Sequence, residues 1–275
     1  MAVSKKCVIP SRPEVFLQFT HLIKEKNPDI NAICAALKRD VALFSAVLAA
    51  VNSPYLGLVQ KITSLEHAVS LLGINRVFSI VRLTALRNSL SEIGRLDRFW
   101  DTSEDVAYIC SVLSRRFSNI NEDDAYTIGM LHDCGIPLMM GNFGDFKSFL
   151  SNIKGENISL LHGAEMEAFG SSHYNLGFQV ASEWNFPKGL CSAILEQPNY
   201  SSFLRDTCEE KLQSRMLLSI LLLSKEVSRK YRTYWRVNQP DIPIISDMEV
   251  PLNVLAISEA DFIEFRDEIL LKMQA

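Results

Sequence analysis

The chain has 275 residues, 48% of them hydrophobic and 22% charged, which is the composition of a folded globular protein of one or two domains. Its formal net charge of −4 argues against a surface built mainly to bind nucleic acid. With only 12 glycines and 10 prolines, collagen-like, disordered and turn-rich β architectures are disfavoured.

The first half of the chain carries apolar residues at three- and four-residue spacing, which predicts helices over residues 15–23, 30–37, 41–51, 64–72 and 75–89. Asp29 and Asp40 stand where N-caps are needed, and Asn52-Ser53-Pro54 ends the third helix. Gly73 separates the last two helices. The polar residues 91–97 form the best boundary within the chain.

The second half has the same periodicity and predicts helices over residues 102–117, 121–133, 143–153, 158–169, 173–184, 187–195, 203–231 and 258–273. Residues 237–251 contain three prolines and predict an irregular connection. The fold class is therefore all-α. We expect an N-terminal helical lobe at 1–97, packed on a second helical lobe at 98–235, and a C-terminal extension at 236–275.

The six cysteines include no Cys-x-x-Cys pair, so neither a disulfide framework nor a zinc knuckle is indicated. The longest apolar run, residues 216–223, is far shorter than the roughly 20 residues of a membrane span. The first residues lack the apolar stretch of a secretory signal. These features predict a reduced, cytoplasmic protein that has no membrane partner.

The strongest local motif is the His132-Asp133 doublet, which lies near the end of a predicted apolar helix in Gly129-Met-Leu-His132-Asp133-Cys-Gly135. Adjacent His and Asp side chains can share a metal ion if other helices supply further ligands, since a catalytic centre needs about three protein ligands and an open position. The alternative is a histidine that is hydrogen-bonded in the core, which is the commoner role of a histidine in an apolar segment.

The order of the motifs resembles the HDOD proteins, a bacterial signalling family related to the HD-domain metal-dependent phosphohydrolases. Besides the doublet, the resemblance is carried by Lys38-Arg-Asp40-Val-Ala-Leu43, Leu48-Ala-Ala-Val-Asn52-Ser53-Pro-Tyr55, Ile62-Thr-Ser-Leu65-Glu-His-Ala68-Val-Ser-Leu-Leu72-Gly73, Glu167-Ala-Phe-Gly170-Ser-Ser-His173-Tyr-Asn-Leu-Gly177 and Trp184-Asn-Phe-Pro187. These blocks span about residues 8–200. The resemblance implies that the second lobe is a degenerate HD-like bundle.

The same resemblance shows which ligands of an HD centre this chain lacks. The doublet matches His132 and Asp133, and His173 matches a further histidine of many relatives. Thr102 stands where the first histidine of the hydrolases would be, and Glu167 is only a remote fourth ligand. The segment 194–198 lacks the histidine pair of relatives, and the helix over 216–230 lacks an aspartate. We therefore expect no bound metal, no other cofactor and no catalytic residue.

The resemblance implies a non-catalytic signal-transduction module that acts through protein interaction or senses a small molecule such as a nucleotide. Signalling partners would be supplied in trans, because no kinase or cyclase domain is attached. The alternative is an HD-type phosphohydrolase or phosphodiesterase with an incomplete ligand set. Motifs of kinases, dinucleotide enzymes, serine hydrolases and zincins do not occur.

Two other groups of residues are weaker candidates. The first is a basic and aromatic cluster that comprises Lys225, Arg229, Lys230, Tyr231, Arg232, Tyr234, Trp235 and Arg236. Such a cluster could contact nucleic acid, but cations near a helix C-terminus are more simply explained by the helix dipole. The acids Glu165 and Glu167 lie near His162 on a predicted helix, where such pairs are usually solvated. We expect no nucleic-acid partner.

Overall fold

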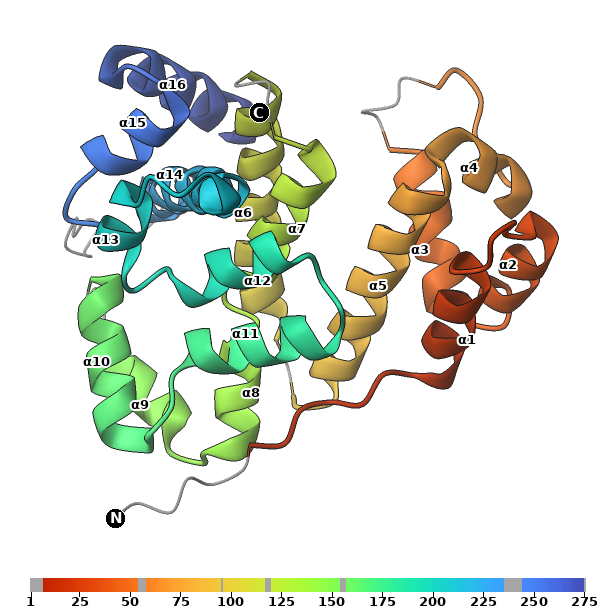
Figure 1. Ribbon diagram of the computed structural model, residues 1–275, viewed down its shortest axis with the longest axis horizontal. Coiled ribbons are helices and arrows are strands. Elements are labelled where there is room, and N and C mark those ends of the chain that lie inside the picture. Colours follow the sequence, from red (N-terminus) through yellow and green to blue (C-terminus); the bar gives the residue numbers. More distant parts are fainter. Residues whose placement is uncertain are drawn as a thin grey trace. The chain divides into compact units, whose positions relative to one another are not determined.

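The computed structural model describes residues 7–53, 58–94, 96–116, 120–153, 157–234 and 244–274, which form helices and turns without a strand among them. The predicted all-α class is confirmed (Figure 1). The chain divides into two compact units. The smaller unit is Pro10–Gly94, and the larger unit combines Met1–Ile9 with Arg95–Ala275. Residue Val8 is held in the larger unit, where its N–H donates to Asn142 Oδ1 at 2.8 Å.

The smaller unit contains the predicted five helices, and their bounds differ from the expected ones by two residues at most. They are α1 (Glu14–Ile23), α2 (Ile30–Leu37), α3 (Val41–Val51), α4 (Leu65–Leu72) and α5 (Ile74–Ser91). The apolar faces meet in a core where Phe16 and Phe19 of α1 stack on Phe78 of α5, with ring centroids 6.2 and 6.1 Å apart. Asp29 and Asp40 cap α2 and α3 as expected, because their carboxylates accept the free N–H groups of each first turn.

Glycine is required between α4 and α5. Gly73 has φ +79°, a conformation that side chains with a Cβ rarely adopt, and it both ends α4 and begins α5. No single helix in the described ranges is long and apolar enough to span a membrane. The pair α4 and α5 reaches that length and composition only together, and bends by 112° at this glycine.

Asn52 closes the loop that follows α3. Its Nδ2 donates to the carbonyls of Leu48 (2.8 Å) and Ile62 (2.7 Å), and its Oδ1 accepts the N–H of Ile62 at 2.7 Å. The Asn52 side chain therefore bonds to backbone at the predicted helix end, and it joins segments ten residues apart. The neighbouring Pro54 and Tyr55 of the motif lie outside the described residues.

Replacing Asn52 by Ala is expected to lower the free energy of unfolding by about 2 kcal/mol, because both backbone groups of Ile62 lose their partner. Urea unfolding followed by circular dichroism measures the loss, and hydrogen exchange at the Ile62 amide localises it. The control is Asn31→Ala, since Asn31 is exposed on α2. Equal stability of the two variants would contradict the bridging role of Asn52.

The larger unit is built around one long helix, α14 (Leu212–Tyr234), in which residues 217–228 are all buried. This helix contacts α6, α7 and α12 as well as the C-terminal helices (Figure 1). The other helices of this unit are α6 (Asp97–Arg116), α7 (Glu122–Leu131), α8 (Gly135–Asn142), α9 (Phe146–Asn152), α10 (Ile158–Phe169), α11 (His173–Glu183), α12 (Lys188–Leu195), α13 (Tyr200–Arg205), α15 (Glu249–Leu255) and α16 (Glu259–Gln274).

One predicted helix of this unit was wrong, and the observed helix α8 was not predicted. The single helix expected over 203–231 is broken, because Asp206 adopts an extended conformation and its carboxylate accepts the N–H of Cys208 at 2.9 Å, an alternative to helical bonding. The segment 237–251 was expected to be irregular; residues 237–243 lie outside the described residues, 244–248 are irregular as expected, and α15 begins at Glu249 and includes Pro251. Proline is tolerated there because the first turn of a helix leaves its N–H groups unpaired.

The C-terminal helices α15 and α16 are an integral part of the larger unit. The carboxylate of Glu226, on α14, accepts the N–H groups of Ile244 and Ile245. The hydroxyl of Tyr200 accepts the N–H groups of Ser246 (3.1 Å) and Asp247 (3.2 Å). These bonds fix the chain where it enters α15, so the region beyond the recognised motifs packs with them.

The cysteines differ in exposure. Cys34, Cys110, Cys134 and Cys191 are buried, Cys7 is half-buried and Cys208 is exposed, all as free thiols. Burial also raises the pKa of Cys110 to about 12, which keeps this thiol neutral. We expect Ellman's reagent to modify Cys208 rapidly in the native protein and the four buried thiols only after unfolding. Cys208→Ser removes the rapid phase; a rapid phase that persists would contradict the assigned burial.

Candidate functional site

The His132-Asp133 doublet lies at the C-terminal end of α7, in the tight turn that leads into α8. The side chain of Asn121 caps α7 by accepting the N–H groups of Asp123 and Asp124. The turn is closed by the N–H of Cys134, which donates to the Leu131 carbonyl at 2.9 Å. His132 is buried, and the Asp133 side chain is 21% exposed. Two polar side chains at the end of an apolar helix therefore lie in the interior of the larger unit.

Both ring nitrogens of His132 face hydrogen-bond acceptors. Nδ1 lies 2.7 Å from the Gly129 carbonyl and Nε2 lies 3.1 Å from Asp133 Oδ2. A carbonyl and a carboxylate are both acceptors, so each ring nitrogen of His132 has an acceptor within hydrogen-bond distance. His132 is thus hydrogen-bonded in the core, which is the alternative that the sequence left open.

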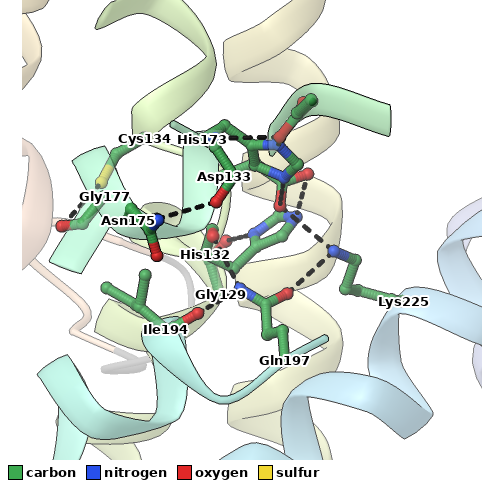
Figure 2. Close-up of polar contacts among 12 residues, drawn as sticks. Gly129, His132, Asp133, Cys134, His173, Asn175, Gly177, Ile194, Gln197 and Lys225 are labelled. Atoms are coloured by element: carbon green, nitrogen blue, oxygen red, sulfur yellow. Dashed lines mark hydrogen bonds and ion pairs between the residues drawn. The ribbon is translucent and has the colours of Figure 1, made fainter. Parts of the chain in front are cut away.

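His173 stands at the N-terminus of α11, where its partner is Glu165 of α10. The Glu165 carboxylate is fully buried and lies 2.7 Å from His173 Nδ1 through Oε1. Its Oε2 accepts the backbone N–H of His173 at 3.0 Å. This double contact fixes the ring, and His173 Nε2 then faces Asp133 Oδ1 at 3.8 Å. Two histidines thus converge on one carboxylate (Figure 2).

The remaining side of Asp133 is occupied by Lys225 from α14. The Lys225 ammonium donates to Asp133 Oδ1 at 3.1 Å and to Gln197 Oε1 at 3.0 Å. Gln197 is fully buried, and its Nε2 donates to the carbonyls of His132 (2.8 Å) and Ile194 (3.2 Å). Gln197 therefore orients both the doublet and the lysine (Figure 2).

The charges around Asp133 keep it ionised. Burial by itself raises the pKa of Asp133, but the neighbouring charges of His132 and Lys225 outweigh burial and hold the pKa well below its ordinary value. Burial raises the pKa of the adjacent Cys134 thiol, so this sulfur is not an activated nucleophile. We name the group of His132, Asp133, Glu165, His173, Gln197 and Lys225 the Asp133 cluster.

The structure brings together three of the five predicted site residues and leaves two outside. His132, Asp133 and His173 meet. Glu167 is exposed on α10, whereas Glu165, two residues earlier, is the acid that contacts His173. The hydroxyl of Thr102 is bonded to the Arg98 carbonyl of its own helix at 2.9 Å, so it is directed to its own backbone rather than to the cluster. The interpretation of Glu165 as a solvated residue was wrong, because α10 turns this position toward α11.

Lys225 was also misassigned. It was placed with a basic and aromatic cluster at a helix end, but it lies in the interior of α14 with a side chain 9% exposed. Other cations of that cluster have internal partners: Arg229 pairs with Glu226 at 2.9 Å, and Arg232 pairs with Asp105 of α6. Trp235 and Arg236 lie outside the described residues. A lysine in the middle of a long apolar run was the available sequence signal, since such a charge is buried only with a partner.

The residues of the Asp133 cluster do not fit a metal ion. The described part of the chain contains no group of three His, Cys, Asp or Glu side chains arranged to hold one. His132 Nε2 is paired with Asp133 Oδ2, and the Lys225 ammonium occupies Asp133 Oδ1, the carboxylate oxygen that a cation would take. A metal centre needs these same atoms as lone-pair donors.

Comparison with known proteins matches these features to one family. The sequence profile of the HDOD domain matches residues 9–200, about two thirds of the chain and both of the motif-bearing regions. The chain belongs to the HDOD domain family. An uncharacterized protein of Treponema pallidum (strain Nichols) is 23% identical over 191 residues, which cover 68% of this chain but only 37% of that protein. The HDOD chain therefore spans little more than a third of this relative.

Solved structures agree with the HD-like helical fold. A protein provisionally named a phosphohydrolase, from Shewanella amazonensis SB2B, has a TM-score of 0.68 at 21% identity and covers 96% of this chain and 91% of its own. A protein provisionally named a signal transduction protein, from Marinobacter aquaeolei VT8, has a TM-score of 0.68 at 19% identity and covers 98% of this chain and 60% of its own. At such identities the similarity establishes the fold of this HDOD protein.

Proposed function

We propose that this HDOD chain is a non-catalytic signal-transduction module that acts by binding a protein partner or a small ligand such as a nucleotide. The observation that carries the proposal is the ion pair between Lys225 and Asp133. Family membership and the name of the Marinobacter aquaeolei relative are consistent with a signalling role.

The chemical argument concerns the activation of water. A metal-dependent phosphohydrolase polarises a phosphoryl oxygen and lowers the pKa of a bound water, and both effects need a cation with open coordination positions. The Lys225 ammonium has three N–H donors but cannot coordinate a water or a phosphoryl oxygen as a metal ion does. Two of its N–H groups already donate to Asp133 and Gln197. The Asp133 cluster therefore has a structural role in this proposal.

The direct test is metal analysis of protein purified without chelator, combined with assays on nucleotides and cyclic dinucleotides in the presence of Mg²⁺, Mn²⁺ or Ni²⁺. We expect no stoichiometric metal and no turnover above background. Turnover that disappears in both His132→Ala and Asp133→Ala would overturn the proposal in favour of an HD-type phosphohydrolase with an incomplete ligand set.

The binding role is tested separately. The full chain is used as bait in a lysate of its native host, and a panel of nucleotides is screened by thermal shift. A specific partner or a saturable rise of the melting temperature is expected. Failure of both measurements would contradict a signalling module of this kind.

A further inference from the structure

We propose that the Asp133 cluster is a cation site whose resident cation is the chain's own Lys225 ammonium, and that the site takes up a small exogenous ammonium ion when this group is removed. The inference rests on the proposed function, because it assumes that no metal occupies the cluster in the wild-type protein. The ligand expected at the Asp133 cluster is a compact monovalent cation with N–H donors.

The first observation is the way the histidines are held. The ring of His132 is oriented by the Gly129 carbonyl at 2.7 Å, and the ring of His173 by the Glu165 carboxylate at 2.7 Å, each through Nδ1. Both Nε2 atoms therefore face Asp133, at 3.1 and 3.8 Å. A carbonyl or carboxylate behind each histidine is the outer support that cation centres use to fix their ligands. This frame remains although the cluster does not fit a metal.

The second observation is the charge balance inside the frame. Asp133 and the fully buried Glu165 bring two negative charges, and the second lies on the far side of His173 from Lys225. Two acceptors, Asp133 Oδ1 and Gln197 Oε1, lie 3.1 and 3.0 Å from Nζ, which are hydrogen-bond distances for an ammonium. Gln197 is held by the His132 and Ile194 carbonyls, so its oxygen is fixed toward Lys225.

The third observation is the size and enclosure of the resident group. The Lys225 side chain is only 9% exposed, and its neighbours along residues 217–228 are buried. Truncation to alanine removes Cγ, Cδ, Cε and Nζ, which are the heavy atoms of n-propylammonium. The space that remains matches this ion in length and offers its nitrogen the two acceptors of Lys225.

The experiment compares Lys225→Ala with Lys225→Met in the full chain. Loss of one partner of a buried ion pair is strongly destabilising, so we expect the melting temperature of both variants to fall by roughly 10 °C. n-Propylammonium chloride should restore about half of the loss in Lys225→Ala, since a ligand of the native state raises its melting point. It should leave Lys225→Met and the wild type unchanged, because methionine fills the space.

Uncharged n-propanol is the matched ligand control. Equal rescue of Lys225→Ala by n-propanol and n-propylammonium would overturn the inference, because filling the cavity would then be sufficient. Wild-type stability of Lys225→Met would also overturn it, because no charge would be needed. Ni²⁺ or Mn²⁺ should not raise the melting temperature of Lys225→Ala; such a rise would overturn the inference, because the site would then take a divalent ion rather than an ammonium.

A double-mutant cycle keeps the inference testable if Lys225→Ala does not fold. Since Lys225 acts through Asp133, the Asp133→Asn/Lys225→Met double variant should melt no lower than the less stable of the two single variants. Additive losses would overturn the inference. Metal in the wild-type protein would instead overturn the proposed function, so the two failures are distinguishable.

Discussion

Replacing Gly135 by Ala is expected to lower the free energy of unfolding by about 3 kcal/mol or more. An added Cβ at Gly135 would lie 1.8 Å from the backbone oxygen of His173 and 2.8 Å from the backbone nitrogen of Gly177. Both contacts are with backbone, so no side-chain rotation relieves them. Urea unfolding followed by circular dichroism measures the loss.

The control is Gly163→Ala. Gly163 lies within α10, is exposed, and has nothing within 4 Å of an added Cβ. Because alanine has the higher helix propensity, this variant should be more stable than the wild type by about 0.5–1 kcal/mol. If Gly135→Ala were as stable as Gly163→Ala, the close approach of α8 to α11 would be refuted. This approach also fixes the backbone that carries His173.

Glu165→Ala is expected to lower the free energy of unfolding by about 3–5 kcal/mol. The substitution leaves Nδ1 and the backbone N–H of His173 buried without the carboxylate that now accepts both. Glu165 itself is fully buried, so water compensates little of this loss. The measurement is again urea unfolding, together with the NMR resonances of the His173 ring.

Glu167→Ala is the matched control, on the same helix two residues further along. Glu167 is exposed, and substitutions of exposed residues usually change stability by less than about 0.5 kcal/mol. A loss in Glu167→Ala as large as in Glu165→Ala would mean that Glu165 has no special role in holding His173.

Much of the fold could be predicted from local sequence. Apolar spacing of three and four residues gave the helices of the smaller unit, and Asp29, Asp40 and Gly73 marked ends that lie where expected. These signals act over one or two turns, so they survive without knowledge of tertiary contacts. The break at Asp206 was missed because its competing side-chain bond to Cys208 has no periodicity.

The site was predictable only in part. His132, Asp133 and His173 stood out as polar residues within recognisable motifs, and they do converge on one carboxylate. Glu165 was missed because the sequence around it is ordinary helix, in which an acid is usually solvated. Lys225 was missed because it was grouped with the cations that follow it, although the apolar run before it indicated burial. The partner of Lys225 is 92 residues away, and no local pattern specifies such a pair.

The sequence by itself determined the all-α class and many of the helix ends, because hydrophobic periodicity and helix capping are local properties. Its resemblance to the HDOD family indicated the three motif residues of the site. Only the tertiary structure decided which polar side chains the interior contains. Lys225 and Glu165 are charged residues whose burial is tolerated once α14 and α10 bring them to Asp133 and His173. Their roles follow from packing between helices that are distant in sequence, because this packing sets which partner each buried charged side chain has.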